Sequence, residues 1–380
     1  MKPRFAAAIS EHPLATQAVG ETVGSILEQL DDPPDLVVMF ATDAHTGVLE
    51  DMTRAVRTLL NPRVLVGSNA ESVLGGSQEV EHGPALCLFA ARFDVDLQPI
   101  RLEAFPGPDG AVIVAGGTGL ESNEGTLLLL ADPATFPVTE VVEHLGEVVG
   151  AIAVAGGMSA AGHRPGGNRL ILDDERFADG AVGVLLPPTV GVTTLVSQGC
   201  RPFGSPMVVT KAEGNVIYEL AGRPALDRLM EQVGGLDTET RAIAAKGLHV
   251  GLVIDEGREH FGAGDFLVRG VLGADKGNGA VAIGEPTEVG ATVQFHLRDP
   301  ARADEDLRLM LAAQQARGVL AFTCNGRGRR FFGTPNHDAE LLGELLDAPA
   351  LAGMFCAGEL GPVGGRTFLH SFTTSLALFG

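Results

Sequence analysis

Side chains suited to chemistry gather in two glycine-containing segments near the end of the chain, CNGRG from Cys324 and CAGEL from Cys356. The first offers a thiol, the Asn325 amide and the Arg327 guanidinium, which can bind a carboxylate or phosphate in a forked geometry. Its glycines let backbone N–H groups face a ligand. The second holds a lone carboxylate, Glu359, in an apolar setting where a buried charge needs a partner. These residue types predict a pocket that takes a carboxylate at Arg327 and an ammonium at Glu359.

Each of these features also has a structural interpretation. The CNGRG segment can be a tight turn with a buried thiol and surface arginines. Glu359 can pair with an internal arginine, Arg327 or Arg366, instead of a ligand ammonium. Cys324 and Cys356 each follow an apolar run, so on adjacent parallel strands they would lie side by side. They are then a redox pair or two wall residues of a pocket, and the second reading is favoured because cytosolic thiols stay mostly reduced.

A short PNHD motif lies between the two segments. His337 can act as a base for Cys324, which is the pattern of a cysteine transferase or hydrolase. Asn336 and Asp338 precede an apolar periodic stretch, where they can cap a helix without any further function. No oriented third group is evident beside the thiol and the imidazole, so capping is the preferred interpretation.

Two polar positions earlier in the chain are also candidates for ligand binding. Arg201, in SQGCRPFG, lies before a proline in the stretch that joins the two halves of the chain. It can reach an anion held by the carboxy-terminal half, or it can be a surface arginine. Ser159, in the glycine turn GGMS, offers a hydroxyl beside exposed N–H groups, although serine is also an ordinary turn residue.

Motifs for metals and common cofactors are not found in the sequence. The four cysteines are widely spaced, and the histidines form neither HxxxH nor HExxH. The glycine-rich GADKGNGA lacks the spacing of a phosphate-binding loop, and GxSxG is absent. We therefore expect no metal and no cofactor.

The elements that must position these residues recur along the chain. Apolar runs beginning at Leu36, Thr126 and Gly318 are each followed by a loop, an amphipathic stretch, a second apolar run ending in a glycine turn, and a closing apolar run. A leading strand and helix precede the first run and are expected again at 292–297 and 301–316. The predicted unit is strand, helix, strand, helix, strand, strand. We expect an α/β protein of two layered domains with mixed sheets, 1–212 and 213–380.

Charge and composition narrow the range of partners. The 380 residues include 27 Lys and Arg against 48 Asp and Glu, a net charge of −21. Such a surface repels phosphate backbones and anionic lipid, so neither nucleic acid nor a membrane is expected as a partner. No apolar run approaches the length of a signal peptide core or a membrane span, which predicts a cytoplasmic protein.

The motifs SQGCRPFG, VTKAEGNVIYELAGRPAL, FTCNGRG, PNHD and CAGELGPVGG, in that order, resemble those of the FIST family. The resemblance covers nearly the whole chain, with the glycine turns GSNAESVLGG and GGMSAAG matching the FIST N half and the later motifs the FIST C half. It implies a free-standing small-molecule sensory protein, with an amino acid or related metabolite as ligand. A signalling protein is the second partner that the resemblance implies.

Three functions remain open from the sequence. The first is a binding protein, not an enzyme, whose pocket is lined by loops of the carboxy-terminal half with Cys324, Asn325, Arg327, Cys356, Glu359, Arg201 and Ser159. The second is the cysteine enzyme using Cys324 and His337. The third is an adaptor whose pocket grips a partner protein.

Overall fold

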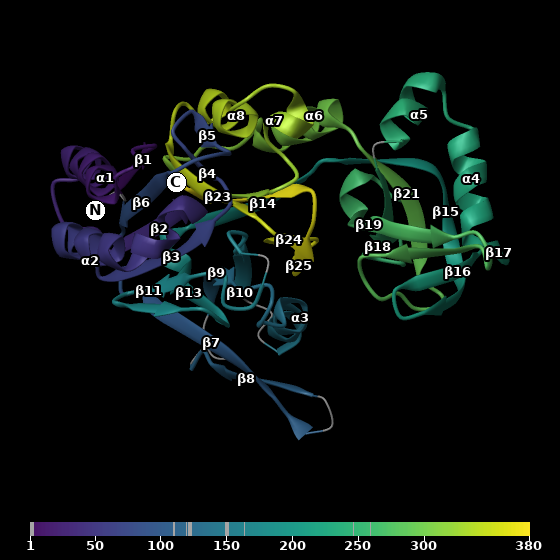
Figure 1. The fold of residues 1–380 in the computed structure, drawn as a ribbon, viewed down its shortest axis with the longest axis horizontal. Coiled ribbons are helices and arrows are strands. Elements are labelled where there is room, and N and C mark those ends of the chain that lie inside the picture. The colour runs from purple at the N-terminus through teal and green to yellow at the C-terminus, as the bar shows by residue number, and fades with distance from the viewer. Residues whose placement is uncertain are drawn as a thin grey trace. The chain divides into compact units, whose positions relative to one another are not determined.

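The computed structural model describes residues 4–108, 111–118, 120, 124–148, 152–162, 164–245, 247–258 and 260–380. The chain forms two compact units. The first comprises Met1–Val196, Arg308–Leu369 and Thr373–Gly380, and the second comprises Ser197–Leu307 and His370–Phe372. Both contain helices and sheets, so the predicted α/β class is confirmed (Figure 1). The sheets of the first unit are mixed, whereas the described strands of the second unit pair antiparallel. No helix among these residues combines the length and apolarity needed to cross a bilayer.

Three sheets build the first unit. In spatial order, one contains β1 (Arg4–Ser10), β6 (Leu86–Arg92), β2 (Leu36–Thr42), β3 (Val64–Ala70), β11 (Leu170–Leu172) and β12 (Glu175–Phe177). The next contains β25 (Arg366–His370), β24 (Glu359–Val363), β10 (Ile152–Met158), β9 (Gly125–Ala131), β13 (Ala181–Leu186), β7 (Gln98–Pro106) and β8 (Val112–Gly116). The last contains β14 (Val192–Gln198), β26 (Thr373–Phe379), β22 (Gly318–Cys324), β23 (Ala350–Cys356), β4 (Val73–Gly75) and β5 (Gln78–Val80).

These sheets share one plan, which confirms the predicted repeat. In each, a parallel pair (β2 and β3, β9 and β10, β22 and β23) lies beside an antiparallel closing strand. The outer hairpin, however, always comes from another repeat. Hairpin β11–β12 extends the first sheet, β24–β25 extends the second, and β4–β5 extends the third. The three repeats therefore exchange hairpins in a closed cycle.

Helices connect the parallel strands, as a parallel pair requires. The 3-10 segment η1 (Asp43–Val48) and α2 (Leu49–Leu60) connect β2 to β3, α3 (Val138–Val148) connects β9 to β10, and the short α7 (Arg329–Phe332) and α8 (His337–Leu345) connect β22 to β23. Outside these pairs, α1 (Ala15–Gln29) precedes β2, α6 (Pro300–Leu311) precedes β22, and the 3-10 segment η4 (Pro188–Val190) follows β13. α1 and α2 lie side by side against the first sheet (Figure 1). Strands β2, β3, β22 and β26 are buried along their whole length, because both of their faces are covered. Phenylalanines of different repeats meet in the central core, such as Phe40 and Phe322, whose ring centroids are 6.2 Å apart.

The expected leader of the third repeat was wrong. β21 (Thr292–Arg298) pairs with β15 (Cys200–Glu213) and β18 (Leu248–Val253) in the sheet of the second unit. β14 stands instead beside β26, where β1 stands beside β6 in the first sheet. Along the chain, the second unit is thus an insertion within the third repeat. The domain boundary that the sequence predicted, after residue 212, falls inside β15. It stays a prediction.

The second unit is built on one sheet. Its order is β15, β21, β18, β19 (Phe266–Asp275), β20 (Ala280–Ile283), β16 (Val216–Leu220) and β17 (Arg223–Pro224), with α4 (Ala225–Gly234), α5 (Thr238–Ala244) and the 3-10 segment η5 (Ala263–Asp265). β15 also pairs with β16, so this sheet closes on itself. Phe203 and Phe295 stack within its apolar core.

Candidate functional site

A pocket of about 290 Å³ lies where the second and third repeats meet, and we call it the neutral pocket. It is lined by Pro133, Ala134, Ser159, Ala160, Gly162, Asn325 and Ala357. Its walls come from segments that follow β9, β10, β22 and β23, the carboxyl ends of two parallel pairs. Ligands bind at such ends in α/β sheets. Two of the residues predicted from the sequence, Ser159 and Asn325, belong to this lining.

Hydrogen bonds fix the backbone around the neutral pocket. The N–H of Asn325 donates to the carbonyl of Cys356 at 2.9 Å, and the N–H of Ser159 donates to that of Ala131 at 2.8 Å. The Ser159 hydroxyl donates to the Asn69 carbonyl at 2.7 Å. The exposed Asn325 carboxamide bonds to none of the described residues, so its donors and acceptor are available to a ligand.

Arg327 does not line the neutral pocket. It is fully buried, and its Nε and Nη2 donate to the two carboxylate oxygens of Asp338 at 2.7 and 2.9 Å. Burial alone would raise the pKa of Asp338, but the guanidinium outweighs it and lowers that pKa to about 2. The predicted carboxylate-binding role of Arg327 therefore needs correction, because an internal carboxylate already occupies its forked donors.

Glu359 is buried as well and stands outside the lining of the neutral pocket. Its Oε2 accepts from the Thr373 hydroxyl at 2.8 Å and the Thr373 N–H at 3.2 Å, and the Cys324 side chain also hydrogen-bonds to it. Burial raises its pKa to about 8. At neutral pH the carboxyl is mainly protonated, so neither an arginine nor a ligand ammonium is needed to compensate it.

The two cysteines lie side by side as expected, since Cys324 and Cys356 are register partners on β22 and β23. Both are buried, and burial raises the pKa of Cys356 well above its usual value. His337 directs Nδ1 to the Asp338 carboxylate at 3.0 Å and stacks on Phe332 with ring centroids 3.5 Å apart. Neither thiol is among the residues that line the neutral pocket, although both had been predicted as wall residues.

The cap of α8 comes from a distant strand and not from PNHD. Oε1 of Glu79, on β5, accepts from the N–H groups of Asp338 and Ala339 at 2.8 and 3.0 Å. Asn336 instead accepts from the N–H of Glu79 at 2.9 Å. Burial, with the nearby Asp338 charge, raises the pKa of Glu79 to about 7. The β4–β5 hairpin thus supplies the N-terminal cap of α8, which the PNHD motif was expected to supply.

Arg201 belongs to the second unit, where it pairs with Asp299 at 3.3 Å. Its Nη2 also donates to the Thr240 hydroxyl at 3.5 Å. Within the described residues, no three His, Cys, Asp or Glu side chains are grouped to hold a metal ion.

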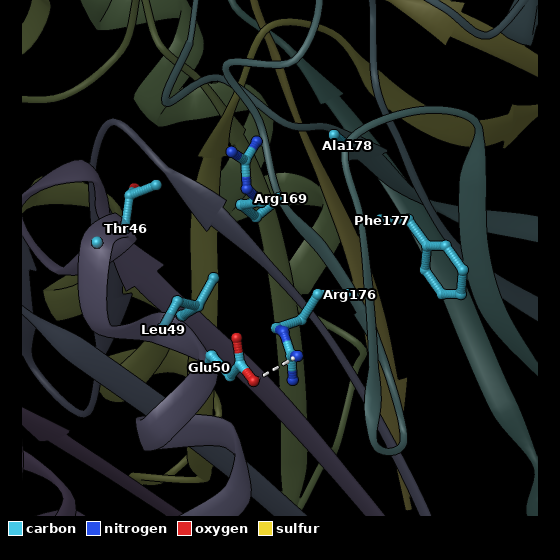
Figure 2. Close-up of a pocket in the computed structure, with 8 residues that line it drawn as sticks. Thr46, Leu49, Glu50, Arg169, Arg176, Phe177 and Ala178 are labelled. Carbon is cyan, nitrogen blue, oxygen red and sulfur yellow. Dashed lines mark ion pairs between the residues drawn. The ribbon is translucent and has the colours of Figure 1, made fainter.

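Sequence reasoning missed a second, larger pocket of about 490 Å³, which we call the charged pocket (Figure 2). Its lining comprises Thr46, Gly47, Leu49, Glu50, Arg169, Arg176, Phe177 and Ala178. Figure 2 shows the Arg176 guanidinium directed at Glu50, and the two groups are 2.9 Å apart. The one available signal was the pair of arginines, Arg169 and Arg176, that follow the predicted glycine turn of the second repeat.

Comparisons with known proteins agree with this architecture. Residues 35–223 match the model of the FIST N domain, and residues 225–362 match that of the FIST C domain. An uncharacterized protein of Mycobacterium bovis is 43% identical over 99% of this chain and 98% of its own length. An uncharacterized protein of Mycobacterium tuberculosis is 42% identical over 99% of both chains.

Proposed function

The chain belongs to the FIST family, whose domains are associated with small-ligand sensing in signal transduction, and on that premise we propose that it binds an amino acid or a similar metabolite in the neutral pocket. The observation that carries the proposal is the Asn325 carboxamide, which lines the pocket and has no partner among the described residues. A carboxamide can donate to a ligand carboxylate and accept from a ligand ammonium.

The size and rigidity of the neutral pocket support a ligand of this class. Its volume of about 290 Å³ is near the lower end for small-molecule sites. Ser159 is held by Asn69, so the lining does not need to be ordered when the ligand binds. Recognition rests on hydrogen bonds and not on charge, because Arg327 is taken by Asp338.

Signal output is proposed to follow from the same contacts. Asn325 and Ala357 connect the pocket to β23 and to β10 through backbone hydrogen bonds to Cys356 and Met158. A ligand that binds one arrangement of these loops more tightly shifts the population toward it. A signalling protein in the cytoplasm would read that shift.

Calorimetry with each of the twenty standard amino acids tests the proposal. We expect at least one to bind, and Asn325→Ala to weaken it by roughly tenfold, the effect of one lost hydrogen bond in a desolvated site. Ser159→Ala should weaken it less, because the Ser159 hydroxyl is already bonded to Asn69 and Ser68 and acts by holding the lining in place. Gln17→Ala, which removes an exposed carboxamide on α1, is the matched control. Affinity unchanged in both pocket variants, or no binding by any amino acid, would overturn the proposal.

A further inference from the structure

We propose that the charged pocket is a second ligand site, which binds a small organic anion with a carboxylate at one end and an apolar body. Its lining combines two guanidinium groups with one carboxylate, on a protein whose net charge is −21. The wall is thus positive by one charge where the rest of the molecule is acidic. Such a local reversal attracts small anions to this place.

Arg169 is the residue that gives the site its unbalanced charge. No carboxylate of the described residues lies within ion-pair distance of it. Its Nη1 donates to the carbonyls of Gly166 and Asn168 at 2.6 and 2.7 Å, which fixes the side chain without neutralising it. Its backbone N–H donates to the Asn69 carboxamide at 2.7 Å. The guanidinium is therefore positioned before any ligand arrives, which reduces the entropic cost of binding.

Arg176 adds a second cation whose partner is shared. Glu50 accepts from both Arg176 and Arg54 at 2.9 Å, so its carboxylate is shared between two guanidinium groups, of which Arg54 also pairs with Asp51 at 3.1 Å. The Arg176 side chain is 27% exposed, and that of Glu50 is 54% exposed. A ligand carboxylate entering the pocket can bind Arg169 and still lie close to Arg176.

The remaining lining favours an organic anion over a bare inorganic one. Phe177 and Ala178, which are partly exposed, contribute apolar surface beside the charged groups. The guanidinium carbon of Arg101 lies over the Phe177 ring, 4.1 Å from its centroid. The Thr46 hydroxyl accepts from Asn69 at 3.0 Å, which leaves its own proton to donate to a ligand.

Calorimetry on the full chain with benzoate, benzamide and inorganic phosphate tests the site. We expect benzoate to bind, and benzamide, which has the same shape without the charge, to bind at least roughly tenfold more weakly. Phosphate should also be weaker than benzoate because it gains nothing from the apolar wall. Equal binding of benzoate and benzamide, stronger binding of phosphate, or no binding of benzoate at millimolar concentration would overturn the proposal.

Variants locate the binding and separate this site from the neutral pocket. Arg169→Gln should weaken benzoate roughly tenfold or more, whereas Arg164→Gln, an exposed arginine outside the lining, should not. Glu50→Gln should tighten benzoate several-fold, a gain that misfolding cannot produce. Asn325→Ala should leave benzoate affinity unchanged, so failure here and failure of the amino-acid proposal are distinguishable. Benzoate affinity insensitive to Arg169→Gln would contradict the assignment.

Discussion

The junction between the first and second repeats and the junction between the second and third repeats are built alike, yet the first leaves an arginine at a pocket and the second buries a glutamate. Arg169 stands directly before the hairpin strand β11, and Glu359 begins the hairpin strand β24. The next residues, Leu170 and Leu360, each pair with the fifth residue of the neighbouring parallel strand. Arg169 lines a pocket, whereas Glu359 is fully buried. The repeated backbone sets the position, and the local neighbours decide whether the side chain meets solvent or the core.

A second pair of residues teaches the same lesson. Arg327 and Arg169 are both arginines in loops at strand ends, but only Arg327 has a carboxylate partner, Asp338. A buried, bidentate pair is part of the structure, while a fixed but unbalanced guanidinium remains available to a ligand. The difference can be tested by removing each charge in turn.

Removing the buried charge of Arg327 should have the largest effect on the free energy of unfolding. Arg327→Met leaves the Asp338 carboxylate buried without its partner, which costs about 3–5 kcal/mol of unfolding free energy. Arg330→Met, an exposed arginine three residues along, is the control and should change stability by less than about 0.5 kcal/mol. Urea unfolding measures both. A loss below about 1 kcal/mol for Arg327→Met would remove the distinction between the two arginines.

The buried carboxyl groups of Glu359 and Glu79 should also make the free energy of unfolding depend on pH. The pKa of Glu359 is raised to about 8 and that of Glu79 to about 7, so between about pH 4.5 and those values the folded chain holds protons that the unfolded chain has released. Unfolding free energy should therefore fall as pH rises through this window, by up to about 1.4 kcal/mol per pH unit and per group. Asp338, with its pKa lowered to about 2, acts in the opposite direction, and its contribution is lost as pH falls below about 4.

Glu359→Gln isolates one of these contributions, since glutamine has the shape of the protonated acid. Its stability should vary less between pH 5 and 8 than that of the parent chain, as measured by urea unfolding at each pH. Glu50→Gln, on the exposed rim of the charged pocket, should leave the slope as it is. Parallel profiles for Glu359→Gln and the parent chain would show that Glu359 carries no proton at neutral pH.

Removing the pocket-lining charge of Arg169 should have the smallest effect on the free energy of unfolding. Arg169→Gln breaks no ion pair with the described residues, so the unfolding free energy should change by less than about 0.5 kcal/mol. Thermal unfolding without added ligand measures it. A loss comparable to that of Arg327→Met would make Arg169 a structural residue too.

Sequence patterns within single segments predicted the parallel strands and the residues at their ends. The apolar runs located the parallel strands, and their equivalent ends placed Cys324 beside Cys356. The same reasoning brought Asn325 and Ser159 to one pocket, because loops at the carboxyl ends of neighbouring strands converge.

Contacts between distant segments could not be predicted in this way. Glu79 caps α8 from 259 residues away, and no spacing within PNHD indicates it. Burial of Arg327 depends on Asp338 in α8, and the pattern of glycines around Arg327 favoured an open loop equally well. The strand at 292–297 had the expected periodicity, yet its pairing partners lie in the second unit. Periodicity indicates an element but not its neighbours.

Because the repeats exchange hairpins, an early hairpin cannot pair until a late part of the chain has been translated. Val73, Leu74 and Gly75 of β4 find their partners only at Met354, Gly353 and Ala352 of β23. Until that part has been translated, the hairpin of the earliest repeat exposes an unmatched edge, which is a point of entry for aggregation. The three repeats can complete their sheets only after β23 has been translated, so nascent chains should depend on chaperones more than the folded protein does.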